Sequence, residues 1–358
     1  MVVLSVMPMH NDHHHNNIVP VPIIDMSSRR DMKVELILKA CEDFGFFQVI
    51  NHGIPDKVIA RMEKFGMDFF SLPASEKLLA GPANPFGYGT KSIGSSGDTG
   101  DLEYLLLHSN PMFVSQRART ISPNNSKEFS YVVNEYVGEV RELACEILDL
   151  IAQGLGLKDC GVFSTMIRDI DSDSLLRLNH YPPSPSQSPS PSPFSCKSTS
   201  TTNTTKIRFG EHSDPQIITI LHSNNVAGLQ ILSPSSAGSL WIPIMPNPAA
   251  FCVNVGDVLQ AMTNGRLVSV RHRVMGNKSN GARMSTAFFG SPPLHAWISP
   301  MPETITRFRP CCYKSFTWSE FKNVMYSLRL GHDRLDLFRL DYNIHHDDDD
   351  QEEYYSCE

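Results

Sequence analysis

Residues 207–233 read IRFGEHSDPQIITILHSNNVAGLQILS. Three short runs rich in isoleucine, leucine and phenylalanine are separated here by Asp-Pro and by a segment with two asparagines and a glycine. Runs of the same kind continue on both sides, from about residue 175 to about residue 290, with Gly, Pro, Asn and Ser between them. Many short strands at this spacing are typical of a β-sandwich or jelly roll. We therefore predict a β core in the second half of the chain.

The sequence around this core has helical periodicity. Apolar residues recur every three or four positions over 132–155, which predicts the longest helix of the chain. Further helices are expected at 31–44, 55–72 and 318–330, and further strands at 18–25, 46–53 and 102–108. The predicted fold is α+β, with a double-stranded β-helix (jelly roll) core and flanking helices.

Several stretches lack the apolar pattern of a packed core. Residues 1–17 and the acidic residues 331–358 are predicted to be a disordered leader and tail, and the Pro/Ser/Thr-rich stretch 182–205 a disordered insert between two strands. The glycine-rich stretch 81–101 is expected to be an irregular lid or binding loop. The remaining chain is assigned to a helical N-terminal region with edge strands, 18–170, and a jelly-roll domain, 171–330.

Charge and composition exclude some classes of partner. Seven of the 38 acidic residues lie in the last twelve positions, and the remaining 31 equal the number of Lys and Arg residues. A neutral body without a basic stripe argues against nucleic acid as a partner. No run of eighteen apolar residues exists, so no membrane span is predicted. The eight cysteines are scattered without a CxxC pair, which favours reduced thiols and a cytosolic protein.

The strongest chemical signal is His212-Ser213-Asp214, with His272 sixty residues downstream. Positions i and i+2 of a strand point the same way, so His212 and Asp214 can bind one ion, and His272 would come from a neighbouring strand. Two imidazoles and one carboxylate suit Fe(II) and leave coordination positions open. The alternative is a polar turn and an unrelated buried histidine, because fourteen histidines make chance matches easy.

Four further residues repeat the same-face spacing of two. Arg283 and Ser285 lie in ARMST, and Asn179 and Tyr181 lie in LNHYPP. An arginine in an apolar strand needs an anionic partner, because an unpaired buried guanidinium is costly. A carboxylate ligand held by Arg283 with the Ser285 and Tyr181 hydroxyls is one interpretation, and a salt bridge to an internal acid is the other.

Together these motifs resemble those of a known family. His212, Asp214 and His272, with Arg283 and Ser285, match the HxD…H…RxS pattern of the plant 2-oxoglutarate- and Fe(II)-dependent dioxygenases. Asn179 and Tyr181 match the family's NxY, and the resemblance covers roughly residues 18–330. Within the family, NPFGYGTKSIGSSGDTGDLEYLLL and GEHSDPQIITILHSNNVAGLQI resemble the gibberellin 2-beta-dioxygenases that act on nineteen-carbon gibberellins.

The resemblance implies the chemistry of the site. Fe(II) would be held by His212, Asp214 and His272, and 2-oxoglutarate by Arg283, Ser285, Tyr181 and Asn179, with Arg283 also counted among the catalytic residues. Dioxygen would be consumed as 2-oxoglutarate is converted to succinate and carbon dioxide, and the hydroxyl group would go to carbon 2 of the gibberellin, inactivating the hormone. Ascorbate is the expected reductant.

The gibberellin itself is an apolar tetracyclic body with a carboxylate. An apolar pocket with one or two cations is therefore expected. Candidates for the wall are Phe86, Tyr88, Phe288 and Phe289, and candidates for the cation are Lys91 and Arg177. For the aromatic residues the alternative is a place in the core, and for the two cations a solvated or structural role.

Other functions remain open at this point. A second 2-oxoglutarate-dependent oxidase, acting on gibberellins at another carbon or on related plant metabolites, would share every motif. A zinc hydrolase could also use His, Asp and His, but it would need a nearby acid or base for the water proton. A catalytically silent jelly-roll binding module would have no use for two anion sites. The expected compartment is the cytoplasm, with the nucleus as the alternative, and the oligomeric state is not predicted.

Overall fold

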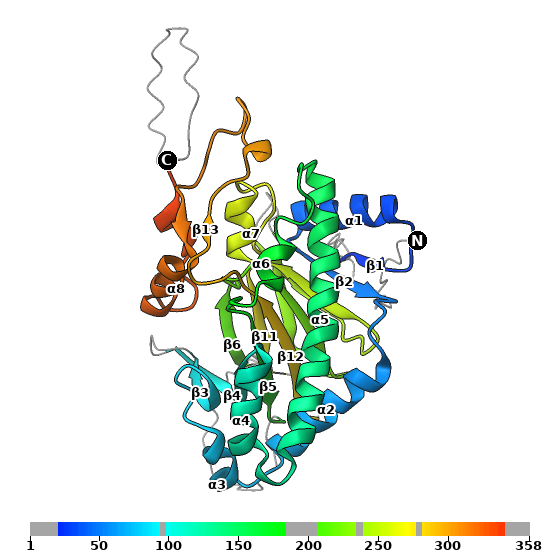
Figure 1. The fold of residues 1–358 in the computed structure, drawn as a ribbon, viewed down its shortest axis with the longest axis vertical. Helices are drawn as coiled ribbons and strands as arrows, with labels where there is room; N and C mark the ends of the chain where they lie inside the picture. The colour runs from blue at the N-terminus through cyan, green and yellow to red at the C-terminus, as the bar shows by residue number, and fades with distance from the viewer. Residues whose placement is uncertain (1–20, 94–97, 184–205, 234–238, 277–280, 341–358) are drawn as a thin grey trace, which may run out of the picture.

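The computed structural model describes residues 21–93, 98–183, 206–233, 239–276 and 281–340. The predicted leader 1–17, most of the predicted insert 182–205 and residues 341–358 of the predicted tail lie outside these ranges. Figure 1 shows two β-sheets behind a layer of helices, with the long helix α5 running across one face of the larger sheet. This arrangement agrees with the predicted jelly roll with flanking helices.

The larger sheet has eight strands in the order β1-β2-β10-β7-β12-β5-β4-β3. The N-terminal part of the chain contributes both edges, since β1 and β2 lie at one side and β3 and β4 at the other. The strands are β1 Ile23–Asp25, β2 Phe46–Ile50, β3 Gly87–Ile93, β4 Asp98–His108, β5 Leu175–Tyr181, β7 Ile218–Ser223, β10 Phe251–Val255 and β12 Arg283–Gly290.

The smaller sheet has four strands in the order β6-β11-β8-β9, all antiparallel to their neighbours. These are β6 Ile207–His212, β11 His272–Met275, β8 Leu229–Ser233 and β9 Leu240–Pro243. A two-stranded ribbon, β13 Trp297–Ile298 and β14 Phe316–Thr317, lies outside the two sheets.

The predicted helices are present near the expected bounds. They are α1 Arg30–Asp43, α2 Asp56–Phe70, α5 Ser126–Leu155 and α8 Trp318–Ser327, and the shorter α3 Ala74–Lys77, α4 Pro111–Ile121, α6 Ser164–Arg168 and α7 Asp257–Met262 are added. The long α5 ends at Gly156, whose φ of 75° lies in the left-handed region that favours glycine. A capping box of Thr317 and Glu320 starts α8.

The two faces of the eight-stranded sheet have different surroundings. The face that carries Leu105, Leu178, Ile220 and Phe288 packs against α1, α2 and α5 in the main apolar core. The opposite face turns toward the four-stranded sheet, and a second, smaller apolar cluster that includes Phe209, Ile231 and Tyr181 fills part of the space between the sheets. We call this second face the interior face.

The glycine-rich stretch 81–101 is not the irregular loop that we predicted. From Gly87 onward, its described residues belong to an antiparallel hairpin of β3 and β4. Gly89 lies so close to Tyr104 of β4 that a Cβ atom at Gly89 would be 2.5 Å from the Tyr104 Cζ. Glycine at this position therefore allows a close approach of an aromatic ring to the backbone, which is a normal use of glycine inside a strand.

The C-terminal part of the chain is packed further than predicted. Residues 331–340, which we assigned to the tail, include a short 3-10 helix, Leu335–Phe338, whose two end residues are buried in the main core. Leu340 N also donates to the carbonyl of Cys312 at 3.0 Å. Two apolar anchors in a predicted acidic tail explain the difference, because the acidic run begins only at Asp347.

The cysteines among the described residues agree with the expectation of reduced thiols, apart from Cys311. Cys41, Cys145, Cys160, Cys252 and Cys312 are free thiols. Cys311 is disulfide-bonded. Among the described residues, no helix is both long enough and apolar enough to cross a lipid bilayer.

Candidate active site

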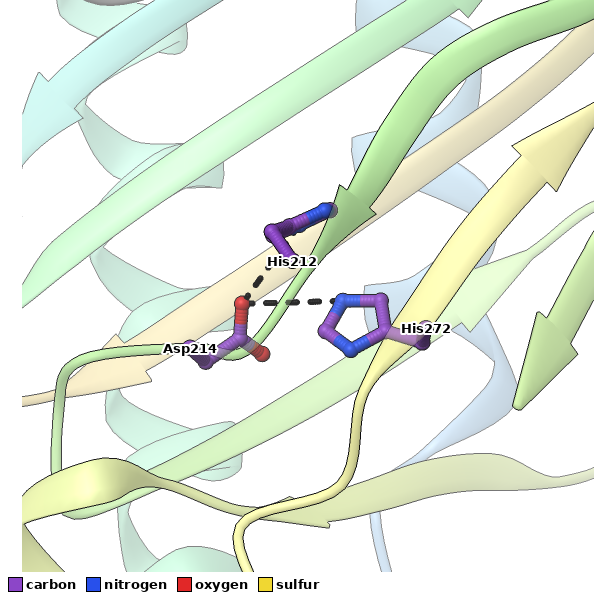
Figure 2. A group of neighbouring side chains, drawn as sticks. All are labelled: His212, Asp214 and His272. Carbon is purple, nitrogen blue, oxygen red and sulfur yellow. Dashed lines mark ion pairs between the residues drawn. The ribbon is translucent and has the colours of Figure 1, made fainter. Parts of the chain in front are cut away.

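Three potential metal ligands converge where β6 ends and β11 begins. His212 is the last residue of β6 and His272 is the first of β11, and the two are direct partners in the antiparallel register. Asp214 follows two residues after His212, where the chain turns away from the strand. Figure 2 shows one oxygen of the Asp214 carboxylate facing both imidazole rings. One potential ligand atom from each residue lies within 4.8 Å of the others.

Hydrogen bonds orient both imidazoles. The Nδ1 of His212 is 2.7 Å from the carbonyl oxygen of Gly210, and the Nδ1 of His272 is 3.2 Å from that of Val270. A carbonyl can only accept, so each Nδ1 carries the proton and each Nε2 presents a lone pair. The two Nε2 atoms lie 3.9 and 3.6 Å from the same Asp214 oxygen, Oδ1.

The other oxygen of Asp214 is fixed by the larger sheet. Its Oδ2 accepts from the Thr219 hydroxyl at 2.7 Å and from the Asn254 amide at 3.2 Å. Burial acts to raise the pKa of Asp214, but His272 and His212, together with these two hydrogen bonds, hold the pKa below its usual range. Asp214 is therefore a carboxylate whose Oδ1 remains available to an ion.

Burial also keeps His212 neutral. Desolvation, and secondly the neighbouring His272, lower the pKa of His212 well below its usual value. The ring stacks on Phe209, with centroids 4.3 Å apart. Neutral imidazoles and an ionised carboxylate are the protonation states that bind a divalent metal.

The donor set fits Fe(II). Ligand atoms that share one ion each lie about 2 Å from it, so separations between 3 and 4 Å are compatible with one central ion. Two imidazole nitrogens and one carboxylate oxygen on one side of the ion are the facial arrangement used by non-haem Fe(II) oxygenases, which leaves the opposite positions open.

A set of anion-binding groups lies on the interior face of β5 and β12. Arg283 of β12 is paired directly with Tyr181 of β5, and Ser285 with Asn179, so all four side chains share one face. The Arg283 Nη1 donates to the Ser285 Oγ at 3.1 Å, and its guanidinium carbon lies 5.3 Å from the centre of the Tyr181 ring. Arg283 and Ser285 are each only 2% exposed, so a ligand here would be shielded from water.

Arg283 is not part of an internal salt bridge among the described residues, which was the competing interpretation. Its Nε is buried and has no hydrogen-bond partner in the described part of the chain. Burial lowers the pKa of this guanidinium, although Tyr181 and Cys252 partly oppose the change. Gly228 packs against it, and a Cβ atom there would be 2.8 Å from the Met275 carbonyl and 3.3 Å from the Arg283 Cδ. A buried cation with a free donor is what an anionic ligand requires.

A second guanidinium, that of the partly buried Arg177, lies on the same face. Its Nε donates to the Asn179 Oδ1 at 2.8 Å, and its Nη2 is buried without a hydrogen-bond partner among the described residues. The guanidinium stacks over the Tyr104 ring at 4.1 Å and over the Phe209 ring at 5.3 Å. Because Phe209 also stacks on His212, one aromatic ring separates Arg177 from the metal ligands.

Two of the aromatic residues predicted to line the substrate pocket lie on the helix side of the sheet, away from the metal ligands. Phe288 is completely buried in the main core and pairs with Leu176 and Ile220 on the helix side of the sheet. Tyr88 also belongs to the main core, and its hydroxyl donates to Glu103 at 2.6 Å. Both predictions are corrected, because alternation along a strand sends neighbouring residues to opposite faces.

The remaining candidates stay predictions. Phe289 is partly buried, and its register pairing with Thr219 puts it on the interior face. Phe86 packs edge-on against His108, with ring centroids 5.7 Å apart. Lys91 is exposed on the edge strand β3. The described contacts therefore connect Arg177, but not Lys91, with the neighbours of the metal ligands.

Sequence reasoning missed the residues that hold the ligands in place. Thr219 and Asn254 fix Asp214, and Phe209 supports His212. A polar residue in the apolar run AFCVNV, at Asn254, was a readable signal. The role of Thr219 was not readable, because a threonine is common in any strand.

Comparison with known proteins agrees with this geometry. The model of the 2OG-Fe(II) oxygenase superfamily matches residues 172–292, and the model of the N-terminal region of non-haem dioxygenases in morphine synthesis matches residues 21–124. A solved structure of JOX2 in complex with 2OG, Fe and JA superimposes with a TM-score of 0.74 at 27% identity, over 90% of this chain and 89% of that one. A dioxygenase for auxin oxidation from rice, 24% identical, shares the fold with a TM-score of 0.71, over 89% of this chain and all of that one.

Curated relatives are more similar in sequence. Gibberellin 2-beta-dioxygenase 1 of Oryza sativa subsp. japonica is 48% identical over an alignment of 337 residues that covers 90% of this chain and 88% of that protein. Gibberellin 2-beta-dioxygenase 4 of Arabidopsis thaliana is 48% identical over 322 residues, 89% of this chain and 94% of that protein. The chain belongs to the gibberellin 2-beta-dioxygenase family of 2-oxoglutarate- and Fe(II)-dependent oxygenases.

Proposed function

We propose that this protein hydroxylates gibberellins at carbon 2 and thereby inactivates bioactive forms of the hormone. One gibberellin, one dioxygen and one 2-oxoglutarate would give the hydroxylated gibberellin, succinate and carbon dioxide. The observation that carries the proposal is a pair of guanidinium groups on the interior face near the triad, those of Arg283 and Arg177, each of which has a buried nitrogen without a hydrogen-bond partner among the described residues. Two organic anions, the co-substrate and the substrate carboxylate, need two such sites.

We assign the co-substrate to the Arg283 site. His212, Asp214 and His272 would hold Fe(II), which, when bound, supplies the dioxygen activation that couples decarboxylation of 2-oxoglutarate to hydroxylation of a C–H bond. Arg283 and the hydroxyl groups of Ser285 and Tyr181 would bind the distal carboxylate of 2-oxoglutarate, with Asn179 beside them. Their role is charge pairing and orientation in a dry site, where a charge-assisted hydrogen bond is strong.

We assign the gibberellin carboxylate to Arg177. Tyr104 and Phe209 hold this guanidinium by stacking, and its Nη2 has hydrogen-bonding capacity left over. An apolar ring system anchored there would extend past Phe209 toward the metal. Phe289 and Phe86 are proposed as apolar contacts, and Lys91 as the alternative cation.

The direct test is an incubation of purified protein with Fe(II), ascorbate, 2-oxoglutarate and a labelled bioactive nineteen-carbon gibberellin. The expected product carries one additional hydroxyl group at carbon 2, identified by mass spectrometry against standards. Arg177→Met should raise the KM for gibberellin about tenfold or more while the KM for 2-oxoglutarate stays within about twofold. Hydroxylation at another carbon would favour the second candidate, a gibberellin oxidase that acts at a different carbon.

The remaining expectations are proposed with their tests. Ascorbate is the expected reductant, and omitting it should shorten the period of linear turnover. The cytoplasm, with the nucleus as the alternative, is the expected compartment, which a fluorescent fusion would test. No nucleic-acid or membrane partner is expected, and salt-dependent retention on DNA or on vesicles would contradict this.

A further inference from the structure

The segment that follows α8 contacts residues that adjoin the metal ligands. Leu330 N donates to the Asp98 Oδ2 at 2.7 Å, and the carbonyl of Gly331 accepts from the Arg271 Nη2 at 2.7 Å. The Arg334 Nη1 donates to the carbonyl of Ser213 at 3.1 Å. Arg271 precedes His272, and Ser213 lies between His212 and Asp214. The C-terminal segment thus touches a neighbour of every metal ligand.

A buried carboxylate, Asp257, connects the same ligand-bearing segments from inside. Its Oδ2 accepts from the Ser213 hydroxyl at 3.3 Å, and its Oδ1 accepts from the Ser269 hydroxyl at 2.6 Å. Its backbone N–H donates to the carbonyl of Asp214 at 2.8 Å. Ser269 lies three residues before His272, so one side chain is bonded to both sides of the site.

Arg334 is the cation that accompanies this carboxylate. Its Nη1 is 3.8 Å from the Asp257 Oδ2, and the two residues are only 4% and 3% exposed. A buried carboxylate without a nearby cation would be costly, so each charge makes the other tolerable. The next residue, Leu335, is buried in the main core and fixes the backbone of Arg334.

The backbone at this point leaves little freedom. Gly256, which precedes Asp257, approaches the turn after Asp214 so closely that a Cβ atom there would be 2.0 Å from the Gln216 carbonyl and 3.1 Å from that of Asp214. The start of α7 is therefore pressed against the ligand turn. A change in the position of Asp257 would be transmitted to Asp214 directly.

We propose that Arg334 and Asp257 form a buried brace that positions the three metal ligands, which makes the C-terminal segment 328–340 a component of the metal centre. Both are positioning residues, because their side-chain contacts are to Ser213, to Ser269 and to each other, and none of these contacts is to a ligand side chain. The inference rests on the metal-binding role proposed for His212, Asp214 and His272, but not on the identity of the organic substrate. Outer contacts of this kind typically change metal affinity by 10- to 100-fold when removed.

The test is a titration of the full-length, metal-free protein with Co(II), followed by its visible absorption. Arg334→Met keeps the length and apolar stem of the side chain, and it should weaken Co(II) binding by about 10- to 100-fold. Arg334→Lys should recover part of the affinity, since the cation is restored without the planar fork. The matched control is Arg339→Met in the same segment, where the arginine side chain is 48% exposed and pairs with Asp336 on the surface, and it should bind Co(II) as the wild type does.

A second variant covers the case in which Arg334→Met does not fold. The double variant Asp257→Asn/Arg334→Met removes both charges, so no unpaired buried charge remains and folding is expected. It should still bind Co(II) about tenfold or more weakly, because the ties to Ser213 and Ser269 are weakened. A role in stability alone would lower the melting temperature and leave the Co(II) affinity and spectrum of the folded variants unchanged, and that result would overturn the brace.

The same measurements distinguish a failure of the brace from a failure of the proposed function. If the wild type does not bind Co(II), or binds it equally well after His212→Ala, the metal site itself is wrong, and the brace is overturned with it. If the wild type binds at the triad but converts no gibberellin, the substrate proposal fails and the brace can still be measured. If Arg334→Met and the double variant both bind Co(II) with wild-type affinity, the brace is overturned and the proposed function is unaffected.

Discussion

The two faces of the eight-stranded sheet treat buried charge in opposite ways. On the helix side, Glu103 accepts from Lys77 and Tyr88 at 2.6 Å each and meets the Nδ1 of His180 at 2.8 Å. On the interior face, Arg283 and Arg177 each retain a buried nitrogen without a hydrogen-bond partner in the described structure. A charge whose partners are all supplied by the chain serves the fold, whereas a charge with capacity left over suits a ligand.

The same contrast is visible in the pKa values. Burial alone would raise the pKa of Glu103, but hydrogen bonds from His180, Lys77 and Tyr88 outweigh it and lower the pKa to about 2. For Arg283 burial is the dominant influence, and the pKa falls because no carboxylate of the described chain compensates for it. Glu103 on the helix side thus has its partners within the chain, whereas Arg283 on the interior face keeps a buried donor that could bind an anion.

The largest effect is expected from a substitution of a metal ligand on the interior side. Asp214→Ala removes the carboxylate that both Nε2 atoms face, so Co(II) binding should be lost and turnover should fall by more than about a thousandfold. Thr219→Val removes only the hydrogen bond to the Asp214 Oδ2 and should weaken metal binding about 10- to 100-fold. Equal effects of the two substitutions would contradict the distinction between ligand and orienting residue.

The next effect concerns the helix side. Phe288→Ala should lower the free energy of unfolding by about 3–5 kcal/mol, because it leaves a cavity in the main core. The KM values for gibberellin and 2-oxoglutarate should stay within about twofold when measured well below the melting temperature. Phe288→Leu is the matched control and should cost less than about 2 kcal/mol. A selective rise in the KM for gibberellin would show instead that Phe288 contacts the substrate.

Arg283→Met tests the interior cation. Losing one partner of a buried charge pair costs about 3 kcal/mol, which corresponds to a rise of about 100-fold in the KM for 2-oxoglutarate. The KM for gibberellin should change much less. Lys77→Met is the matched control on the other face and should change stability without this selective rise. Equal increases for both substrates would argue against the assigned role.

Glu103→Gln gives the smallest expected effect. The folded-state pKa of about 2 lies below the ordinary value of 4.5, so the carboxylate stabilises the fold above about pH 4.5, and this contribution is lost as the pH falls toward 2. The substitution should cost about 2 kcal/mol at pH 7 by urea unfolding. The difference between wild type and variant should narrow below about pH 4.5, and a difference that is constant with pH would show that the charge is not responsible.

The sequence was most informative where chemistry and strand alternation coincide. His212 and Asp214 were predicted to converge with His272 from strand spacing, and the structure brings the three together, although Asp214 lies in the turn after β6. Arg283 and Ser285 were recognisable because a charged residue in an apolar strand needs an explanation. Regular elements with strong periodicity, such as α5, were also predictable.

The errors have a common physical cause, which is that one chain position does not reveal its neighbours in space. Phe288 and Phe289 are adjacent in sequence but belong to opposite faces. Gly89 suggested a loop, although its lack of a side chain makes room for Tyr104. Arg334 is more than a hundred residues from Ser213, and nothing in its local sequence points to that contact.

The metal ligands do not all depend on the same sheet. His212 and His272 belong to the four-stranded sheet, whereas Asp214 is tied through Thr219 and Asn254 to the eight-stranded sheet. An ion bound by all three therefore links the two layers, and its loss should let them open more readily. In a cell, iron supply would then govern the lifetime of the protein as well as its activity, which a comparison of protease digestion rates with and without metal would test.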